Sequence, residues 1–431
     1  MRPRFLLLTA VAGALALAAA TVQPAAAGLP APVPPGVSSA IGTVTGALSG
    51  AASATGSTVT GTVGSATAGA TAATASSWRT TATHGLTLHG TKLGPLDGTT
   101  ELHISVALAM RNAAALRQAI AAGTQITPQQ FAAGYGASQA DAQSVAAYLT
   151  KQGFSHVAIE PNRLFVTGDA TAAQAESAFD TTLSRWNLRG ETLYANDAPA
   201  RVPADLSAPI AVLGLNDAAR MSTPLRRTDT GVPNYLTEYT PQGFWQAYDA
   251  TGAPTGAQTP IAIFAEGDVS GVITDLRSEE SANGLPQVPV QVVQVGLPSS
   301  DTAGADEWDM DTQYSTGMAD TVSQLDIYDT TSLTDADITL EFSRFASDDQ
   351  ARAGSASFGE CEYQAYLDGS MVAMDQVFNE AAAQGQTVFA SSGDTGGFCP
   401  VVPDNGVPAG APDVNYPASS PYVVSVGGTT L

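Results

Sequence analysis

The sequence predicts an α/β protein in which helices cover both faces of a mostly parallel β-sheet, preceded by a smaller α+β domain. The sheet is predicted because short β-prone runs recur in the second half of the chain and helical patterns separate them. Such alternation is typical of a parallel sheet buried between helices, with catalytic groups at the carboxyl ends of the strands. The elements are β-prone runs at Ile261–Phe264, Val288–Val295, Thr387–Ala390 and Tyr422–Val426, and helical patterns around Val272–Ala282, Ala336–Ala346 and Met371–Ala383.

The smaller α+β domain is predicted for residues 81–217. Apolar residues alternate from Leu102 to Leu108, as in a half-buried strand. Thr127-Pro128-Gln129-Gln130 combines an N-cap, a proline at the first helical position and a capping-box glutamine. Further elements are a helix from Ser138 to near Gly153, a hairpin from His156 to Val166 turning at Pro161-Asn162, a helix capped by Thr171, and a last strand at Ile210–Leu215.

The remaining segments are defined by composition. Arg2 and Arg4 precede an apolar run that ends in small residues, so residues 1–27 are predicted to be a signal peptide of a secreted protein. A membrane anchor is the alternative, but the apolar run is short. Residues 28–80 are predicted to be a low-complexity Ala/Thr/Ser/Gly spacer. Residues 218–233 are predicted to be a linker, either cut during processing or left intact, and residues 234–431 the larger domain.

Charge is distributed unevenly along the chain. The formal net charge of −23 argues against nucleic acid and against an anionic membrane surface as partners. Residues 234–431 contain 28 Asp and Glu against three Arg and no Lys, whereas the residues before them are mildly basic. We expect the basic half to dock on the acidic half near neutral pH. Protonation of carboxylates, whose reference pKa values are about 4, would weaken this attraction.

The chain has two cysteines, Cys361 and Cys399. In an exported protein an even count suggests one disulfide, with two buried free thiols as the alternative. A metal site in this chain is not expected, because two cysteines without a nearby histidine are too few ligands.

Proton-transfer chemistry in the larger domain must rely on carboxylates. All four histidines precede the linker, which excludes a Ser-His-Asp arrangement there. Glu307 and Asp311 are four residues apart, so on a helix they share one face and one pKa should rise. One carboxylate of such a pair can accept a proton from a hydroxyl under acid conditions while the other orients it. The alternative is a solvated acidic helix face, which neighbouring Asp306 and Asp309 favour.

A second candidate is Asp394, in a Gly-Asp-Thr-Gly turn after a β-prone run. Kept protonated, its carboxyl could donate a hydrogen bond to an oxyanion. The alternatives are an ordinary Asx-type turn, or a degraded Gly-Asp-Ser-Gly-Gly motif of trypsin-like peptidases. The missing histidine and Thr395 in place of serine make the latter a poor match.

These motifs together resemble the sedolisins, which are serine-carboxyl peptidases. Glu307-Trp308-Asp309-Met310-Asp311 resembles their Glu-Trp-x-Leu-Asp signature, and Ser355-Ala356-Ser357-Phe358-Gly359 their strand beside the substrate. Ser391 to Gly396 resembles their oxyanion turn, and about His84 to Asp217 is similar to their activation domain. The resemblance implies a subtilisin-like fold for the larger domain and an activation prodomain, which we expect to be ferredoxin-like, for the smaller one.

The resemblance also implies roles for individual residues. Glu307 would be general base and later acid, Asp311 its partner, and Asp394 the oxyanion stabiliser. Trp308, Ser357 and Gly359 would bind substrate, and a Cys361–Cys399 disulfide would brace the cleft. The partners would be protein or peptide substrates, with the prodomain as an intramolecular inhibitor.

The sequence departs from the family at its end. The nucleophile motif Gly-Thr-Ser-x-x-x-Pro and the calcium site that follows it do not occur in these residues. Ca²⁺ is therefore expected only for a full-length relative, with no ligands here. Two functions follow as hypotheses: an acid endopeptidase zymogen whose serine lies beyond this chain, or a non-catalytic secreted protein whose prodomain binds or inhibits an intact relative.

Overall fold

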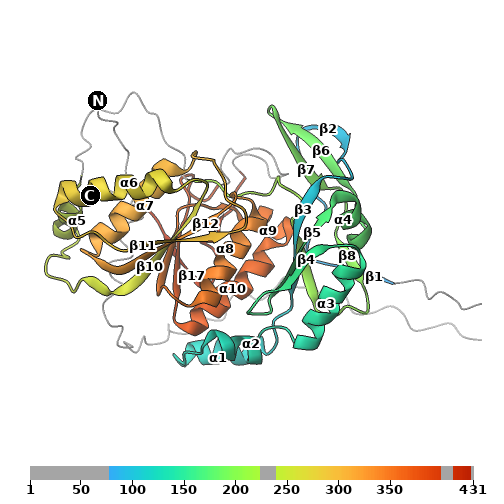
Figure 1. The fold of residues 1–431 in the computed structure, drawn as a ribbon, viewed down its shortest axis with the longest axis horizontal. Helices are drawn as coiled ribbons and strands as arrows, with labels where there is room; N and C mark the ends of the chain where they lie inside the picture. Colours follow the sequence, from blue (N-terminus) through green and yellow to red (C-terminus); the bar gives the residue numbers. More distant parts are fainter. Residues whose placement is uncertain (1–76, 224–238, 399–410, 429–431) are drawn as a thin grey trace, which may run out of the picture. The chain divides into compact units, whose positions relative to one another are not determined.

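A six-stranded parallel sheet forms the centre of the C-terminal domain in the computed structural model (Figure 1). Each neighbouring pair of strands is parallel, which confirms the predicted sheet. In spatial order the strands are β11 (Val290–Val295), β12 (Val322–Thr330), β10 (Gly256–Glu266), β13 (Ala353–Ala356), β15 (Thr387–Ser391) and β17 (Val423–Val426).

Helices cover both faces of this sheet, as predicted. Figure 1 shows α6 (Ser270–Asn283) and α7 (Ala305–Met318) on one face and α8 (Asp335–Asp348) and α10 (Ser370–Gln384) on the other. The ring of Phe264 in β10 lies 4.7 Å from that of Phe342 and 5.2 Å from that of Phe345, both in α8. The shorter elements are α5 (Pro241–Ala247), α9 (Glu362–Asp368), and the two-residue strands β14 (Glu360–Cys361) and β16 (Asn415–Tyr416).

Strand order fixes where a site can form. The chain runs from β10 to β11 and β12 on one side of β10, and then to β13 on its other side. The carboxyl ends of β10 and β13 therefore meet where the direction of strand addition reverses, which is the usual position of a ligand site in such sheets.

The N-terminal domain contains a four-stranded antiparallel sheet in the order β4 (Ser155–Ile159), β5 (Phe165–Thr171), β3 (Glu101–Leu108) and β9 (Pro209–Leu213). Helices α3 (Gln139–Lys151) and α4 (Ala172–Phe179) lie between these strands in the chain, which gives the βαββαβ order of a ferredoxin-like domain. The other elements are β1 (Trp78–Thr80), β2 (Thr91–Pro95), α1 (Ala113–Ala121), α2 (Pro128–Gly134), β6 (Leu183–Leu188), β7 (Glu191–Asn196) and β8 (Arg201–Pro203).

The two faces of the N-terminal sheet pack against different partners. Leu102, Ile104 and Val106 of β3 share a core with residues of α3 and α4, but the strand is not half-buried as predicted, since residues 104–108 are all buried. Ala107 and Phe165, on the opposite face, belong instead to the core of the C-terminal domain. One side of the small sheet is thus buried by its own helices and the other by the larger domain.

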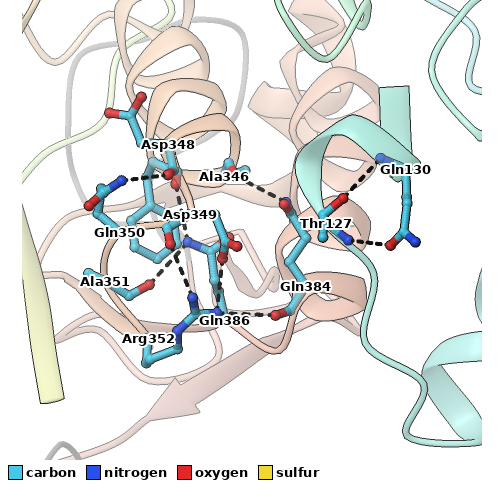
Figure 2. A network of polar contacts seen from close by, with 11 residues as sticks. Thr127, Gln130, Ala346, Asp348, Asp349, Gln350, Ala351, Arg352, Gln384 and Gln386 are labelled. Carbon is cyan, nitrogen blue, oxygen red and sulfur yellow. Dashed lines mark hydrogen bonds and ion pairs between the residues drawn. The ribbon is translucent and has the colours of Figure 1, made fainter. Parts of the chain in front are cut away.

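Polar contacts join the ends of α8 and α10 within the C-terminal domain. The Gln384 side-chain amide donates to the Ala346 carbonyl (3.0 Å), and that of Gln386 donates to the Ala351 carbonyl (3.1 Å). Beside them, Thr127 and Gln130 form the predicted capping box of α2 (Figure 2). Phe131 of α2 is fully buried in the core shared with the C-terminal domain.

The structure describes residues 77–223, 239–398 and 411–428. The predicted signal peptide 1–27, the spacer as far as residue 76 and most of the predicted linker lie outside them. The ordered domain begins earlier than predicted, because Trp78–Thr80 pairs with β8. A three-residue strand carries no recognisable pattern. None of the helices within these described ranges is long and apolar enough to cross a membrane.

Candidate active site

Helix α7 buries both carboxylates that the sequence singled out. Glu307 is 9% exposed and Asp311 is 4% exposed, which excludes the alternative of a solvated acidic face for this pair. Trp308 lies between them in sequence and is 1% exposed. Its indole nitrogen donates to the Glu266 carbonyl (3.0 Å), which fixes α7 against the end of β10.

Asp311 is held by a residue from a neighbouring strand. The Ser357 hydroxyl, directly after β13, donates to Asp311 Oδ1 over 2.7 Å, and Ser357 is fully buried. Burial raises the pKa of the Asp311 carboxyl to about 7, while the hydrogen bond from Ser357 lowers it. This carboxyl is therefore protonated in acid and can accept or return a proton at mildly acidic pH.

Further carboxyls surround this region, and sequence patterns did not identify them. Burial, together with repulsion from Asp301 and Asp329, raises the pKa of Glu266 at the end of β10 to about 7. Burial likewise raises the pKa of Asp329, near the end of β12, to about 7. Their position at the carboxyl ends of strands is the feature by which a sequence analysis could have found them. Among the residues that the structure describes, no group of three or more His, Cys, Asp or Glu side chains is arranged to hold a metal ion.

Asp394 lies in the turn after β15, the strand adjacent to β13, and is exposed. Gly393 (φ +78°) and Gly396 (φ +65°) adopt left-handed backbone conformations that glycine favours, so the Gly-Asp-Thr-Gly sequence suits this turn. The turn thus emerges at the same edge of the sheet as Ser357. The role of Asp394 stays a prediction.

A stretch of the predicted linker lies along Gly359. Ser222 exchanges two backbone hydrogen bonds with Gly359, of 3.0 and 3.1 Å. On the other side of the stretch, the Met221 amide donates to the Leu333 carbonyl (2.8 Å) and the Asp335 amide to the Ala219 carbonyl (3.2 Å). Residues 219–222 therefore form an extended segment held between two parts of the C-terminal domain, as in peptide recognition by strand addition.

The other expected site residues occupy different positions. Gly359 pairs with the linker, and a Cβ there would come 2.0 Å from Asn415 Oδ1, so only glycine fits. Trp308 and Ser357 are buried, and in this structure they pack and bond inside the domain. Cys361 is 6% exposed at the end of β14, whereas Cys399 lies outside the described residues, so their pairing stays a prediction.

Three buried carboxyls lie beneath the bound linker segment, and nothing in the sequence pattern marked them. Asp335, Glu360 and Asp368 are each at most 3% exposed. Burial and repulsion from Asp335 raise the pKa of both Glu360 and Asp368 well above the ordinary values. Burial also raises the pKa of Asp335. The group is compatible with burial only because it retains protons.

The C-terminal domain has buried carboxylates at the carboxyl edge of a parallel sheet. The preceding domain lays an extended segment along that edge. These are the features of a peptidase precursor that uses carboxylates in place of histidine. Residues 89–218 match the family of the pro-kumamolisin activation domain. Sedolisin of Pseudomonas sp. (strain 101) is 38% identical over 352 residues, which are 76% of this chain and 60% of that protein.

A second curated relative and one solved structure also match the chain. Xanthomonalisin of Xanthomonas sp. (strain T-22) is 32% identical over 412 residues, covering 83% of this chain and 50% of that protein. The solved structure of Pseudomonas sedolisin complexed with two molecules of pseudo-iodotyrostatin is 38% identical, with a TM-score of 0.42, and covers 45% of this chain and 55% of that one. The chain is a sedolisin-family precursor, with an activation domain (from here on the prodomain) before a peptidase domain. It spans 60% of the length of sedolisin and half that of xanthomonalisin.

Proposed function

We propose that this chain belongs to a secreted, acid-acting serine-type endopeptidase zymogen whose nucleophilic serine lies beyond Leu431. The observation that carries the proposal is the buried pair Glu307 and Asp311 on α7, with Asp311 fixed by Ser357. A buried carboxyl whose pKa is near 7 is suited to proton transfer, and its neighbour four residues away on one helix face shares that environment.

In the proposed reaction, Glu307 takes the proton of the serine hydroxyl as the serine oxygen bonds to the carbonyl carbon of the scissile peptide. A protonated Asp394 donates a hydrogen bond to the oxyanion that forms. Glu307 then gives its proton to the leaving amine as the C–N bond breaks. Water, deprotonated by Glu307, then bonds to the acyl carbon, and Glu307 returns this proton to the serine oxygen as the ester bond breaks, while Asp311 holds and stabilises Glu307 throughout.

The prodomain is proposed to inhibit the enzyme in the same molecule. The pairing of residues 219–222 with Gly359 and Leu333 supports this, because a substrate added as a strand would need those same backbone groups. We propose that cleavage within residues 223–238 releases the segment. Protein or peptide substrates would then replace it.

Secretion, the Cys361–Cys399 disulfide and calcium are part of the proposal. Secretion is supported by the amino-terminal sequence pattern. Calcium binding is supported by the family resemblance alone. Mass spectrometry of the secreted protein after non-reducing digestion tests the disulfide. The coding DNA beyond Leu431 tests the remainder. Continuation into Gly-Thr-Ser-x-x-x-Pro supports the peptidase, whereas an immediate stop codon favours a non-catalytic protein whose prodomain binds a relative.

Glu307→Gln tests the assigned base. In the protein expressed through its natural stop codon, this change should abolish acid-dependent self-cleavage and leave secretion intact, because glutamine keeps the shape but cannot take the proton. Asp306→Asn, one residue earlier on α7, is the matched control and should be processed normally. Undiminished processing of pure Glu307→Gln protein contradicts the role of Glu307.

A further inference from the structure

Helix α9 carries an exposed aromatic surface next to the position of the bound linker segment. Tyr363 is 50% exposed and Tyr366 48% exposed. Their rings stack at 6.1 Å with an interplanar angle of 23°. Tyr363, Tyr366 and Leu367 are spaced i, i+3 and i+4, so they form one stripe along the helix, named here the α9 stripe. A surface that exposes two large aromatic side chains side by side is typical of an interaction site.

The prodomain already touches one end of the α9 stripe. The ring of His84 lies 5.3 Å from that of Tyr366, and the His84 amide donates to the Leu367 carbonyl (2.8 Å). Leu367 also packs against the small core that contains Ala218 and Ala219. The stripe is therefore in contact with the prodomain at His84 and at the small core that includes Ala218 and Ala219.

The register of that segment shows which part of a bound chain meets the stripe. Ser222 pairs with Gly359, while Ala219, three residues earlier, pairs with Asp335. Ala218 and Ala219 belong to the small core against which Leu367 packs. A peptide held by Gly359 in the same direction would place side chains three and four residues before the paired one at the stripe. In the prodomain those positions hold alanine, so Tyr363 and much of Tyr366 remain uncovered.

We propose that the α9 stripe is an extended specificity surface, which binds a large apolar or aromatic substrate side chain upstream of the residue paired with Gly359. This inference rests on the proposed peptidase function. The occupant is a substrate side chain because the paired segment leads toward the core on which Leu367 packs, and the prodomain leaves Tyr363 and about half of Tyr366 exposed. The two tyrosine rings offer a flat apolar surface with little side-chain entropy to lose on binding.

The test uses the full-length protein after release of its prodomain. Quenched-fluorescence peptides share one cleavable sequence, and one upstream serine at a time is replaced by phenylalanine. At the position that reaches the stripe, phenylalanine should lower KM about two- to tenfold with kcat unchanged. Tyr363→Ala and Tyr366→Ala should lose this preference, whereas Tyr366→Phe should keep it. Tyr248→Ala, on the surface after α5, is the control and should keep it too.

Binding and thermal unfolding separate the possible failures. Calorimetry measures affinity for the serine and phenylalanine peptides on Glu307→Gln protein with and without the tyrosine changes, after a second protease has cut the linker and the prodomain has been removed. The unfolding midpoint of each variant excludes misfolding. Wild-type protein that binds the phenylalanine peptide more tightly but hydrolyses neither contradicts the proposed function and supports the stripe. The same preference in wild type and in both alanine variants, or no preference at any upstream position, overturns the stripe.

Discussion

At the scale of single residues, Ser357 links the central sheet to the proposed catalytic helix. Its hydroxyl donates to Asp311 Oδ1 within a fully buried environment, and Asp311 Oδ2 has no hydrogen-bond partner among the residues that the structure describes. The family resemblance assigned Ser357 to substrate, yet its hydroxyl is here committed to Asp311. Without this donor, the ionised form of the buried Asp311 carboxyl would be less stable.

Ser357→Ala is therefore expected to raise the pKa of Asp311 above its present value of about 7, because the hydrogen bond stabilises the ionised carboxylate. Carboxyl ¹³C NMR titration, with Asp311→Asn to assign the signal, measures this. Ser357→Thr keeps the hydroxyl and should restore the titration. An unchanged titration in Ser357→Ala protein would show that Ser357 does not control the protonation of Asp311.

Asn162 makes a buried hydrogen-bonded contact between the prodomain and the peptidase domain. From the tip of the β4–β5 hairpin, its amide donates to Ser343 Oγ (3.0 Å) and to Glu380 Oε2 (2.9 Å), both buried. Burial raises the pKa of Glu380 to about 8. No ion pair between described residues joins the two domains, so the expected attraction of opposite charges is not expressed as direct pairs in this part of the chain.

Asn162→Ala is expected to lower the free energy of unfolding by about 1–3 kcal/mol, because it removes a donor from buried oxygens and leaves a void. Urea unfolding of the full chain at pH 5 measures the change. Glu380→Gln is the matched control, since its carbonyl still accepts from Asn162 and its stability should stay close to wild type. A smaller loss in Asn162→Ala than in Glu380→Gln contradicts this account.

At the scale of elements, local signals predicted the structure well where they were explicit. Thr127 and Gln130 were predicted to form a capping box, and both reciprocal hydrogen bonds are present in α2 (Figure 2). Thr171, which was predicted to cap a helix, forms a capping box with Gln174 in α4. These contacts are made within four residues, so no distant partner is needed to predict them.

Thr127→Ala is expected to destabilise the full chain by about 1 kcal/mol, because an amide at the start of α2 loses its acceptor. Thr150→Ala, on the exposed surface of α3, removes only a hydroxyl bonded back to the Ala146 carbonyl and should change stability little. Thermal unfolding of the two variants side by side gives the comparison. Equal midpoints would show that the cap contributes nothing measurable.

Elements whose stability depends on distant partners escaped prediction. Strand β12 contains Asp326 and Asp329, which are 1% and 3% exposed. Because these residues are polar, the sequence pattern did not indicate a buried strand here. The pairing of Ser222 with Gly359 joins residues 137 positions apart, and the polar linker sequence indicated exposure instead. The sequence therefore identified the carboxylate pair of α7 and most strands of the sheet, but not the further buried carboxyls or the linker segment that neighbouring elements bring to them.

At the scale of the whole molecule, buried carboxyls couple folding to pH. Burial raises the pKa of Glu266, Asp311 and Asp329 to about 7 and of Glu380 to about 8, and it raises the pKa of Glu341, Glu360 and Asp368 well above the ordinary values. In the unfolded chain such groups lose their protons at about pH 4. From about pH 4 to pH 7 the folded state therefore binds more protons than the unfolded state.

The free energy of unfolding should consequently fall as pH rises from about 4.5 to 7.5, by up to about 1.4 kcal/mol per pH unit for each proton that only the folded state retains. Urea unfolding at a series of pH values in this range measures the slope. Glu341→Gln removes one fully buried carboxyl and should flatten the slope, whereas Asp275→Asn changes an exposed one and should leave it unaltered. A stability that is constant or rises toward pH 7.5 would mean that these carboxyls are ionised in the folded protein with their charge compensated. If the fold is more stable in acid than at neutral pH, buried carboxyls throughout the domain, and not only those of the active site, would suit the proposed enzyme to acid conditions.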